Sequence, residues 1–171
     1  MKETCIETER TNLFEPNNVI AMQFTIVGKI AKEELQKAFQ NAVLANEILN
    51  TKIVIKDNQK AYYEPCTPSH NRLYFIEEKW DFKACYQEQQ KILFQIDKGE
   101  LLRGYAYPSE DEVQVLILAH HLAGDGKSIV YFIEQMMCSL VQNSLCYCKI
   151  NTFSVKDCQM QSPLSTMTRY F

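Results

Sequence analysis

The sequence predicts an α+β fold, a two-layer α/β sandwich in which helices cover one face of a mixed, largely antiparallel sheet. Short runs in which apolar and polar residues alternate predict strands, because successive side chains of a strand point to opposite faces. Longer runs with apolar residues at i, i+3 and i+4 predict amphipathic helices. These runs follow the order β-α-β-β-β-α-β-β-α, and 171 residues suffice for about one domain with a real core.

The first strand and the first helix follow a polar N-terminal segment, residues 1–18. Residues 22–26 alternate between apolar and polar side chains, which predicts a strand that ends at Gly28. A helix is expected from Ala31 onwards. Its apolar face comprises Leu35, Ala38, Phe39, Ala42 and Val43.

Three short β-rich runs and a helix occupy the middle of the chain. Residues 51–55 and 61–63 predict a hairpin with its turn at 57–59, because a polar Asp-Asn-Gln stretch separates two runs of strand-forming residues. Residues 73–76 predict a third strand. Residues 81–96 place their apolar side chains on one side of a helix.

The last three elements include the most apolar segment of the chain. Residues 101–107 predict a strand, and residues 113–120 are apolar on both faces, which is typical of the centre of a sheet. A tight loop at 122–126 then leads into a helix with apolar residues at i, i+3 and i+4 up to Val141. These elements complete the predicted sheet and its helical layer.

The domain organisation follows from where the periodicity begins and ends. Residues 19–142 carry all the predicted elements and form one lobe. The polar segment at 1–18 precedes this lobe, and residues 143–171 form an irregular C-terminal segment.

The composition excludes several classes of partner and site. The net charge of −3 provides no strong field for nucleic acid or an anionic membrane. The N-terminus lacks the apolar stretch of a secretory signal, and the longest apolar run, residues 115–119, is far short of the ~20 residues that span a bilayer. Seven irregularly spaced cysteines therefore predict reduced thiols in a cytoplasmic protein. Cys146 and Cys148, separated by one residue, fit two ordinary thiols better than a metal site, so we expect no metal.

The sequence HHLAGDG at residues 120–126 carries the chemistry. It has the pattern HHxxxDG at the end of the apolar strand. Because adjacent strand residues point to opposite faces, His120 and His121 cannot share one role. Asp125 precedes a helix, where it could cap the helix or pair with a base, and Gly126 suits the sharp turn into that helix. The alternative is purely structural: a buried histidine pair and a capping aspartate.

HHxxxDG after an apolar strand resembles the signature of the chloramphenicol acetyltransferase-like superfamily. The chain is most similar to the condensation domains of nonribosomal peptide synthetases and to the related stand-alone acyltransferases. FTIVGKI at 24–30 resembles the opening strand of the family, EILNT at 47–51 its HExLRT segment, and GELLR at 99–103 its gPLxR strand. The resemblance covers about residues 19–142 and implies a chloramphenicol acetyltransferase-like lobe.

The resemblance implies acyl transfer from a thioester to an amine or an alcohol. The expected donor is acyl-CoA or an acyl carrier protein, with coenzyme A or phosphopantetheine as part of the co-substrate and no bound cofactor. His121 would face the tunnel as the general base, and His120 would be packed behind the strand. The Gly126 amide would border the same tunnel, and Asp125 would hold the loop.

One departure from the family concerns the partner of the aspartate. The arginine of the HExLRT segment often forms a buried ion pair with the aspartate of the motif. Asn50 stands at this position, so Asp125 needs a different partner. Either Arg103, Lys52 or another base takes this role, or the site is relaxed.

The second departure is length. Family members are pseudo-dimers of two similar lobes, and the histidine motif belongs to the first. The sequence resembles this first lobe only, so we expect an apolar side that a second lobe or a second copy of the chain covers. The alternative function is that of a truncated, non-catalytic lobe that acts only as a folding or interaction module.

Overall fold

A computed structural model of the chain describes residues 3–7, 10–13, 18–56, 60–68, 70–78 and 81–142. The strands are β1 (Thr4–Cys5), β2 (Val19–Val27), β3 (Thr51–Ile55), β4 (Ala61–Pro65), β5 (Arg72–Phe75), β6 (Leu102–Pro108) and β7 (Glu112–His120). The α-helices are α1 (Lys32–Ala45), α2 (Phe82–Gln89) and α3 (Gly126–Gln142). Short 3₁₀ segments are η1 (Arg10–Leu13), η2 (Ile48–Asn50), η3 (Ile96–Lys98) and η4 (His121–Ala123).

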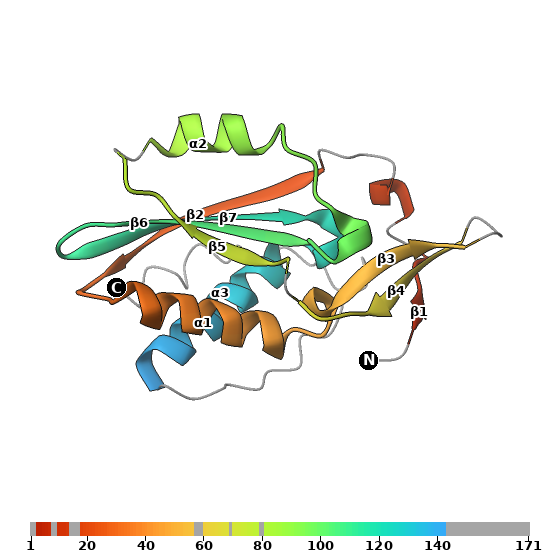
Figure 1. The fold of residues 1–171 in the computed structure, drawn as a ribbon, viewed down its shortest axis with the longest axis horizontal. Coiled ribbons are helices and arrows are strands. Elements are labelled where there is room, and N and C mark those ends of the chain that lie inside the picture. Colours follow the sequence, from red (N-terminus) through yellow and green to blue (C-terminus); the bar gives the residue numbers. More distant parts are fainter. Residues whose placement is uncertain are drawn as a thin grey trace.

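The strands form two sheets, a larger one with the order β2-β7-β6-β5 and a smaller one with the order β1-β4-β3 (Figure 1). β7 pairs antiparallel with β2 and with β6, so that Val19 lies opposite His120. β5 joins β6 in parallel, with Tyr74 opposite Tyr105. In the smaller sheet β3 and β4 form the predicted hairpin. The α+β class and the largely antiparallel sheet are therefore confirmed.

The helices lie on both faces of the larger sheet (Figure 1). α1 and α3 pack on one face, where Phe39 and Phe132 meet edge to face with ring centroids 5.5 Å apart. The short helix α2 lies on the opposite face, over Leu116 and Leu118. This differs from the expected arrangement with helices on one face. The physical reason is that β7 is apolar on both faces, and each face needs a cover.

The helix expected at 81–96 is shorter than its apolar pattern suggests. Asp81 caps α2 by accepting hydrogen bonds from the Lys83 and Ala84 amides, and the helix ends at Gln89. Beyond that point the chain leaves the helix, and the carbonyls of Ile92 and Leu93 accept hydrogen bonds from a buried arginine.

The N-terminal segment contributes to the core, although its polar composition did not indicate it. β1 pairs with β4, and the Ile6 amide donates to the carbonyl of Ala61 at 2.9 Å. The Ile6 side chain is only 2% exposed. The short N-terminal strand is therefore part of the smaller sheet.

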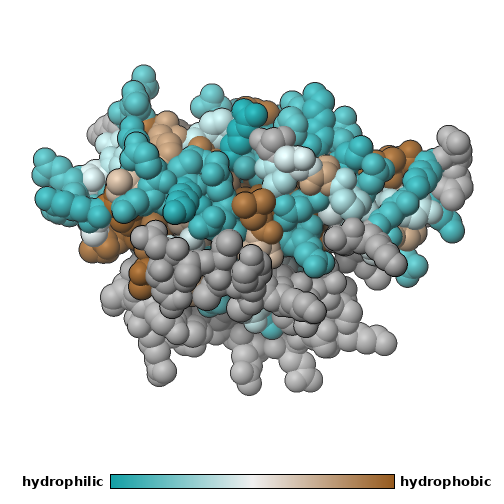
Figure 2. All heavy atoms as spheres, turned by 60° about the horizontal axis from the view of Figure 1, so that its bottom comes forward, coloured by the Kyte–Doolittle hydropathy of each residue, from teal (hydrophilic) through white to brown (hydrophobic). Residues whose placement is uncertain are grey.

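The coloured part of the face shown in Figure 2 is mostly hydrophilic, with scattered hydrophobic side chains. Leu44 of α1 and Val141 of α3 are the exposed large apolar residues of these helices. Among the described helices, none is long and apolar enough to cross a membrane. Within the described ranges, none of the cysteines that the structure places forms a disulfide, namely Cys5, Cys66, Cys85 and Cys138. The expected turn at 57–59, the segment 143–171 and its Cys146 and Cys148 lie outside the described residues.

We predict that Gly104→Ala destabilises the fold by about 1–3 kcal/mol through overpacking. A Cβ at Gly104 would lie 2.7 Å from Leu73 Cδ1 and 2.8 Å from Phe39 Cε2. The measurement is the free energy of unfolding in urea. Gly126→Ala is the control, because no described atom lies within 4 Å of the added Cβ, and it should be neutral or slightly stabilising. Equal stabilities of the two variants would contradict the packing argument.

Candidate functional site

The motif HHxxxDG connects the central strand to the longest helix. β7 ends at His120, η4 follows, and α3 starts at Gly126. The His121 amide donates to the carbonyl of Asn18 at 3.1 Å, and the Gly124 amide donates to the carbonyl of His121 at 3.2 Å. The backbone on both sides of His121 is therefore hydrogen-bonded in place. We call residues 121–125 the motif loop.

His120 is a buried, neutral side chain on the α2 side of the sheet. It is 2% exposed, and its Nδ1 accepts a hydrogen bond from the Leu122 amide at 3.1 Å. Its ring meets Phe94 edge to face, with centroids 5.8 Å apart. Burial, helped by the neighbouring His121, lowers the pKa of His120 to about 4. At neutral pH this imidazole is therefore uncharged and engaged within the loop.

His121 is half-buried and begins η4. None of the described residues hydrogen-bonds its imidazole, in contrast to the ring of His120. The two adjacent histidines therefore have different environments, because His120 is the last residue of β7 and His121 is the first residue of η4. The catalytic role of His121 stays a prediction.

Asp125 caps α3. Its Oδ1 accepts hydrogen bonds from the Ser128 amide and from the Ser128 hydroxyl, both at 2.8 Å. The backbone turn requires glycine at Gly124, whose φ is 140° and whose added Cβ would lie 2.5 Å from Ser128 Cβ. The expectation that Gly126 provides the sharp turn is therefore wrong. Gly126 is the first residue of α3.

Arg103 does not pair with Asp125, which corrects one of our expectations. Its guanidinium forms a bidentate ion pair with Glu100, with Nε–Oε1 at 2.6 Å and Nη2–Oε2 at 2.9 Å. Its Nη1 and Nη2 also donate to the carbonyls of Ile92 and Leu93 at 2.8 and 2.6 Å. Burial alone would raise the pKa of Glu100, but the hydrogen bonds from Arg103 and from the Gln95 amide lower it. The arginine is thus fully engaged on the α2 side of the sheet.

Asn50, at the position of the family arginine, closes the end of a helix. Its Nδ2 donates to the carbonyls of Asn46 at 2.6 Å and of Val43 at 3.0 Å, at the C-terminus of α1. The other proposed base, Lys52, lies 3.3 Å from the carboxylate of Glu64. Arg103 and Lys52 therefore form their ion pairs with Glu100 and Glu64 and not with Asp125. Asn50 is engaged at the end of α1.

Tyr63 is a residue of the site that the sequence analysis placed only in a strand of the predicted hairpin. Its hydroxyl donates to the carbonyl of Leu122 in the motif loop at 2.8 Å, and its side chain is 7% exposed. A buried tyrosine hydroxyl usually has a hydrogen-bond partner. A tyrosine at a buried strand position was the available signal.

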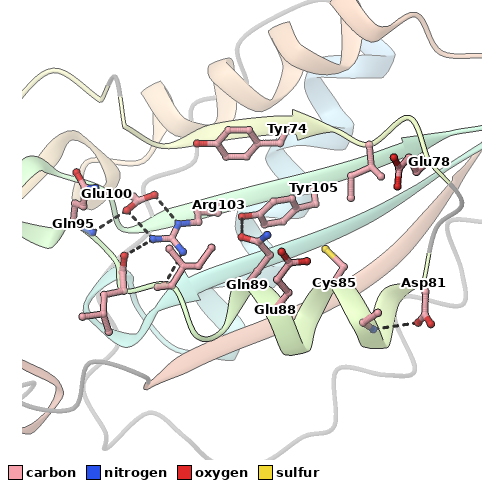
Figure 3. Close-up of a pocket in the computed structure, with 14 residues that line it drawn as sticks. Tyr74, Glu78, Asp81, Cys85, Glu88, Gln89, Gln95, Glu100, Arg103 and Tyr105 are labelled. Carbon is pink, nitrogen blue, oxygen red and sulfur yellow. Dashed lines mark hydrogen bonds and ion pairs between the residues drawn. The ribbon is translucent and has the colours of Figure 1, made fainter.

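A cavity of about 670 Å³ lies between α2 and the larger sheet (Figure 3). Tyr74 and Tyr105 stack along it with ring centroids 5.5 Å apart, and the Tyr105 hydroxyl donates to Gln89 Oε1 at 2.7 Å. Burial raises the pKa of Tyr105. Arg103 lines this cavity, but its donors already bind Glu100 and two carbonyls. His121 and Asp125 are not among the lining residues, so the cavity is separate from the motif loop.

The described residues contain no group of three or more His, Cys, Asp or Glu side chains that could hold a metal ion. The contacts of the two motif histidines are with other protein groups. His120 contacts Phe94 and the Leu122 amide, and His121 is fixed through its backbone.

We predict that acid destabilises the fold through His120. Between pH 6.5 and about 4 the unfolded chain binds a proton at His120 that the folded chain does not. The free energy of unfolding therefore falls as the pH falls through this window, by up to about 3 kcal/mol, and the full contribution is present above pH 6.5. The measurement is urea unfolding at about pH 7 and about pH 4.5.

His120→Asn is the matched control for this pH dependence, because an amide oxygen can still accept from the Leu122 amide but does not titrate. The stability of this variant should fall less between the two pH values than that of the wild type. Parallel losses in both proteins would contradict the assignment of the buried neutral histidine.

We predict that Asp125→Ala lowers stability by about 1 kcal/mol, because α3 loses its N-terminal cap. Asp125→Asn should lose less, because an acceptor oxygen remains while the charge at the helix N-terminus is lost. Thermal melting measures both. Asp81→Ala removes the corresponding cap of α2 and should lower stability to a similar extent. An unchanged melting temperature in Asp125→Ala would contradict the capping role.

Comparisons with known proteins identify the family of the chain and solved structures with a similar fold. The family model "Condensation domain" matches residues 15–143. The fold is similar to the condensation domain of the Monacolin K polyketide synthase MokA, with a TM-score of 0.71, 14% identity, and coverage of 86% of this chain and 36% of that chain. It is also similar to the starter condensation domain of rhizomide synthetase RzmA, with a TM-score of 0.68, 14% identity, and coverage of 88% and 43%.

A third similar structure is the complex of the X-domain and OxyB from teicoplanin biosynthesis, with a TM-score of 0.61, 21% identity, and coverage of 72% of this chain and 27% of that chain. A search of curated proteins gave no match. The chain spans less than half the length of each of these structures. Since the family model matches most of the sequence, residues 15–143, the chain belongs to the condensation-domain family.

Proposed function

We propose that the chain is the first lobe of a condensation-type acyltransferase. It would transfer an acyl group from a coenzyme A or carrier-protein thioester to an amine or an alcohol. The observation that carries this proposal is the division of labour within HHxxxDG: His120 is buried and engaged, whereas His121 is half-buried and no described residue hydrogen-bonds its ring. This leaves one imidazole for a proton of the substrate.

In this reaction His121 acts as the general base. The acceptor nitrogen or oxygen attacks the thioester carbonyl, and its proton passes to the neutral imidazole. The carbon–sulfur bond then breaks, and the leaving thiolate takes the proton from the imidazole and departs as the thiol. Histidine suits this exchange because imidazole gains and loses protons near neutral pH. Holding the acceptor beside the thioester contributes further rate by orientation.

The start of α3 supplies the other group of the proposed mechanism. Asp125 uses its carboxylate on Ser128 and its carbonyl on the Ile129 amide, which fixes the first turn. No described residue accepts a hydrogen bond from the Gly126 amide. This N–H would stabilise the oxyanion that develops on the thioester carbonyl. Asp125 then acts as a structural residue that aims the turn.

The proposed substrate tunnel requires a second lobe to enclose it. The chain spans 36% of the MokA condensation domain and 43% of the RzmA domain. A second lobe, or a second copy of this chain, would close the substrate tunnel opposite His121. The partners under this proposal are acyl-CoA or an acyl carrier protein together with this second lobe.

The alternative is a non-catalytic lobe that acts as a folding or interaction module. Two observations favour it: the family arginine is replaced by Asn50, which caps α1 instead, and one similar structure is the X-domain in complex with OxyB. Thiol release from a panel of acyl-CoA donors with amine and alcohol acceptors distinguishes the two. Acceptor-dependent thiol release supports the acyltransferase, and its absence in a two-lobe protein supports the module.

We predict that His121→Ala, in a protein that carries both lobes, lowers turnover by roughly 10²–10⁴-fold, as is typical for loss of a general base. The measurement is acceptor-dependent thiol release, with thermal melting in parallel. His120→Ala is the comparison variant and should act mainly by lowering the melting temperature, because it removes a buried ring. Full activity in His121→Ala would exclude the general-base mechanism.

A further inference from the structure

The two peptide groups that flank Leu122 are held by two buried side chains. The Leu122 amide donates to His120 Nδ1 at 3.1 Å, and the Leu122 carbonyl accepts from the Tyr63 hydroxyl at 2.8 Å. Tyr63 is 7% exposed and His120 is 2% exposed, so neither contact is open to competition from bulk water. The residue directly after His121 is therefore fixed at both its N–H and its C=O.

Tyr63 reaches the motif loop from the other sheet. It lies on β4, the middle strand of the smaller sheet, opposite Ile53 of β3 and opposite Thr4 of β1. Strands on both sides therefore fix the backbone that carries its ring. The phenol ring has only two side-chain torsions, so a fixed backbone and a buried ring determine where the hydroxyl lies.

The partner of this hydroxyl belongs to a tight turn. Leu122 is the middle residue of η4, and the loop then passes through Gly124 at a φ of 140°. A 3₁₀ turn has poorer hydrogen-bond geometry than an α-helix, so outside contacts contribute more to its position. The Tyr63 hydroxyl provides such a contact one residue beyond His121.

We propose that Tyr63 is a positioning residue for His121: its hydroxyl, anchored in the smaller sheet, holds the Leu122 carbonyl and thereby sets the place of the imidazole. This inference rests on the proposed function, in which His121 is the general base. It adds a contribution of the smaller sheet to the site. Tyr63 itself does not touch the reacting atoms.

The test separates the hydroxyl from the ring. Tyr63→Phe keeps the aromatic packing and removes only the hydroxyl, so the Leu122 carbonyl loses one buried hydrogen bond. Tyr62→Phe is the matched control: this neighbour on β4 is half-buried, and its ring lies 4.7 Å from Lys56 Nζ. Both variants are made in the full 171-residue chain.

The first readout is NMR of the imidazole rings and of amide hydrogen exchange. The chain has three histidines, so the His121 ring signal is assigned by comparison with His121→Ala. We expect Tyr63→Phe to shift or broaden this signal and to speed exchange at the Leu122 and Gly124 amides roughly fivefold, which corresponds to one lost hydrogen bond. Tyr62→Phe should leave both unchanged. Wild-type ring signals and exchange in Tyr63→Phe would overturn the inference.

The second readout is turnover in a protein that carries both lobes. We expect Tyr63→Phe to lower kcat roughly threefold to tenfold with KM little changed, because substrate contacts remain while the base is less well placed. Full activity in His121→Ala would overturn the proposed function. A displaced His121 ring in Tyr63→Phe would still support the positioning contact, so the two failures are distinguishable.

A further measurement applies if Tyr63→Phe does not fold. In the wild type, a slowly exchanging Tyr63 hydroxyl proton with a through-space contact to Leu122 supports the inference. Fast exchange of that hydroxyl together with fast exchange of the Leu122 amide would overturn it.

Discussion

The structure depends on β7, a strand that is buried on both faces. Residues 115–120 are all buried, and their side chains alternate between the α1 and α3 side and the α2 side. A strand of this kind requires a layer on each face, which is why the lobe has two. The same alternation determines the fate of the motif: His120 falls in the row under α2, and His121 follows where the strand has ended. Two identical side chains thus acquire different environments because one ends the strand and the next begins the turn.

The ion pair of Glu100 and Arg103 completes the cover over the first histidine. The guanidinium stacks on Phe94, with Cζ 4.2 Å from the ring centroid, and Phe94 in turn meets His120 edge to face. The same guanidinium holds the carbonyls that follow α2. A buried pair is tolerated when its hydrogen bonds are satisfied, and here both carboxylate oxygens and the guanidinium nitrogens have partners. The charged pair therefore acts on the motif through packing and not through direct contact with Asp125.

Periodicity predicted the elements of the larger sheet and helices α1 and α3, because long apolar patterns reflect burial directly. It did not predict that α2 ends at Gln89 and that Arg103, fourteen residues further along the chain, binds the Ile92 and Leu93 carbonyls that follow the helix. The motif identified the loop. It did not show that Gly124 is the position that requires glycine, because this depends on the close approach of Ser128 in the folded turn. The partner of Arg103 and the cap formed by Asn50 are likewise contacts of the folded chain that spacing alone does not specify.

The N-terminal strand β1 has a bearing on how the protein is handled. Thr4 pairs with Tyr63, and the Ile6 amide binds the carbonyl of Ala61, so the first few residues brace the strand that reaches the motif loop. An affinity tag fused close to Thr4, or a trimmed start beyond Ile6, would disturb that brace, although it lies about 115 positions before the histidines in the sequence. Boundaries for expression are best chosen with these residues retained.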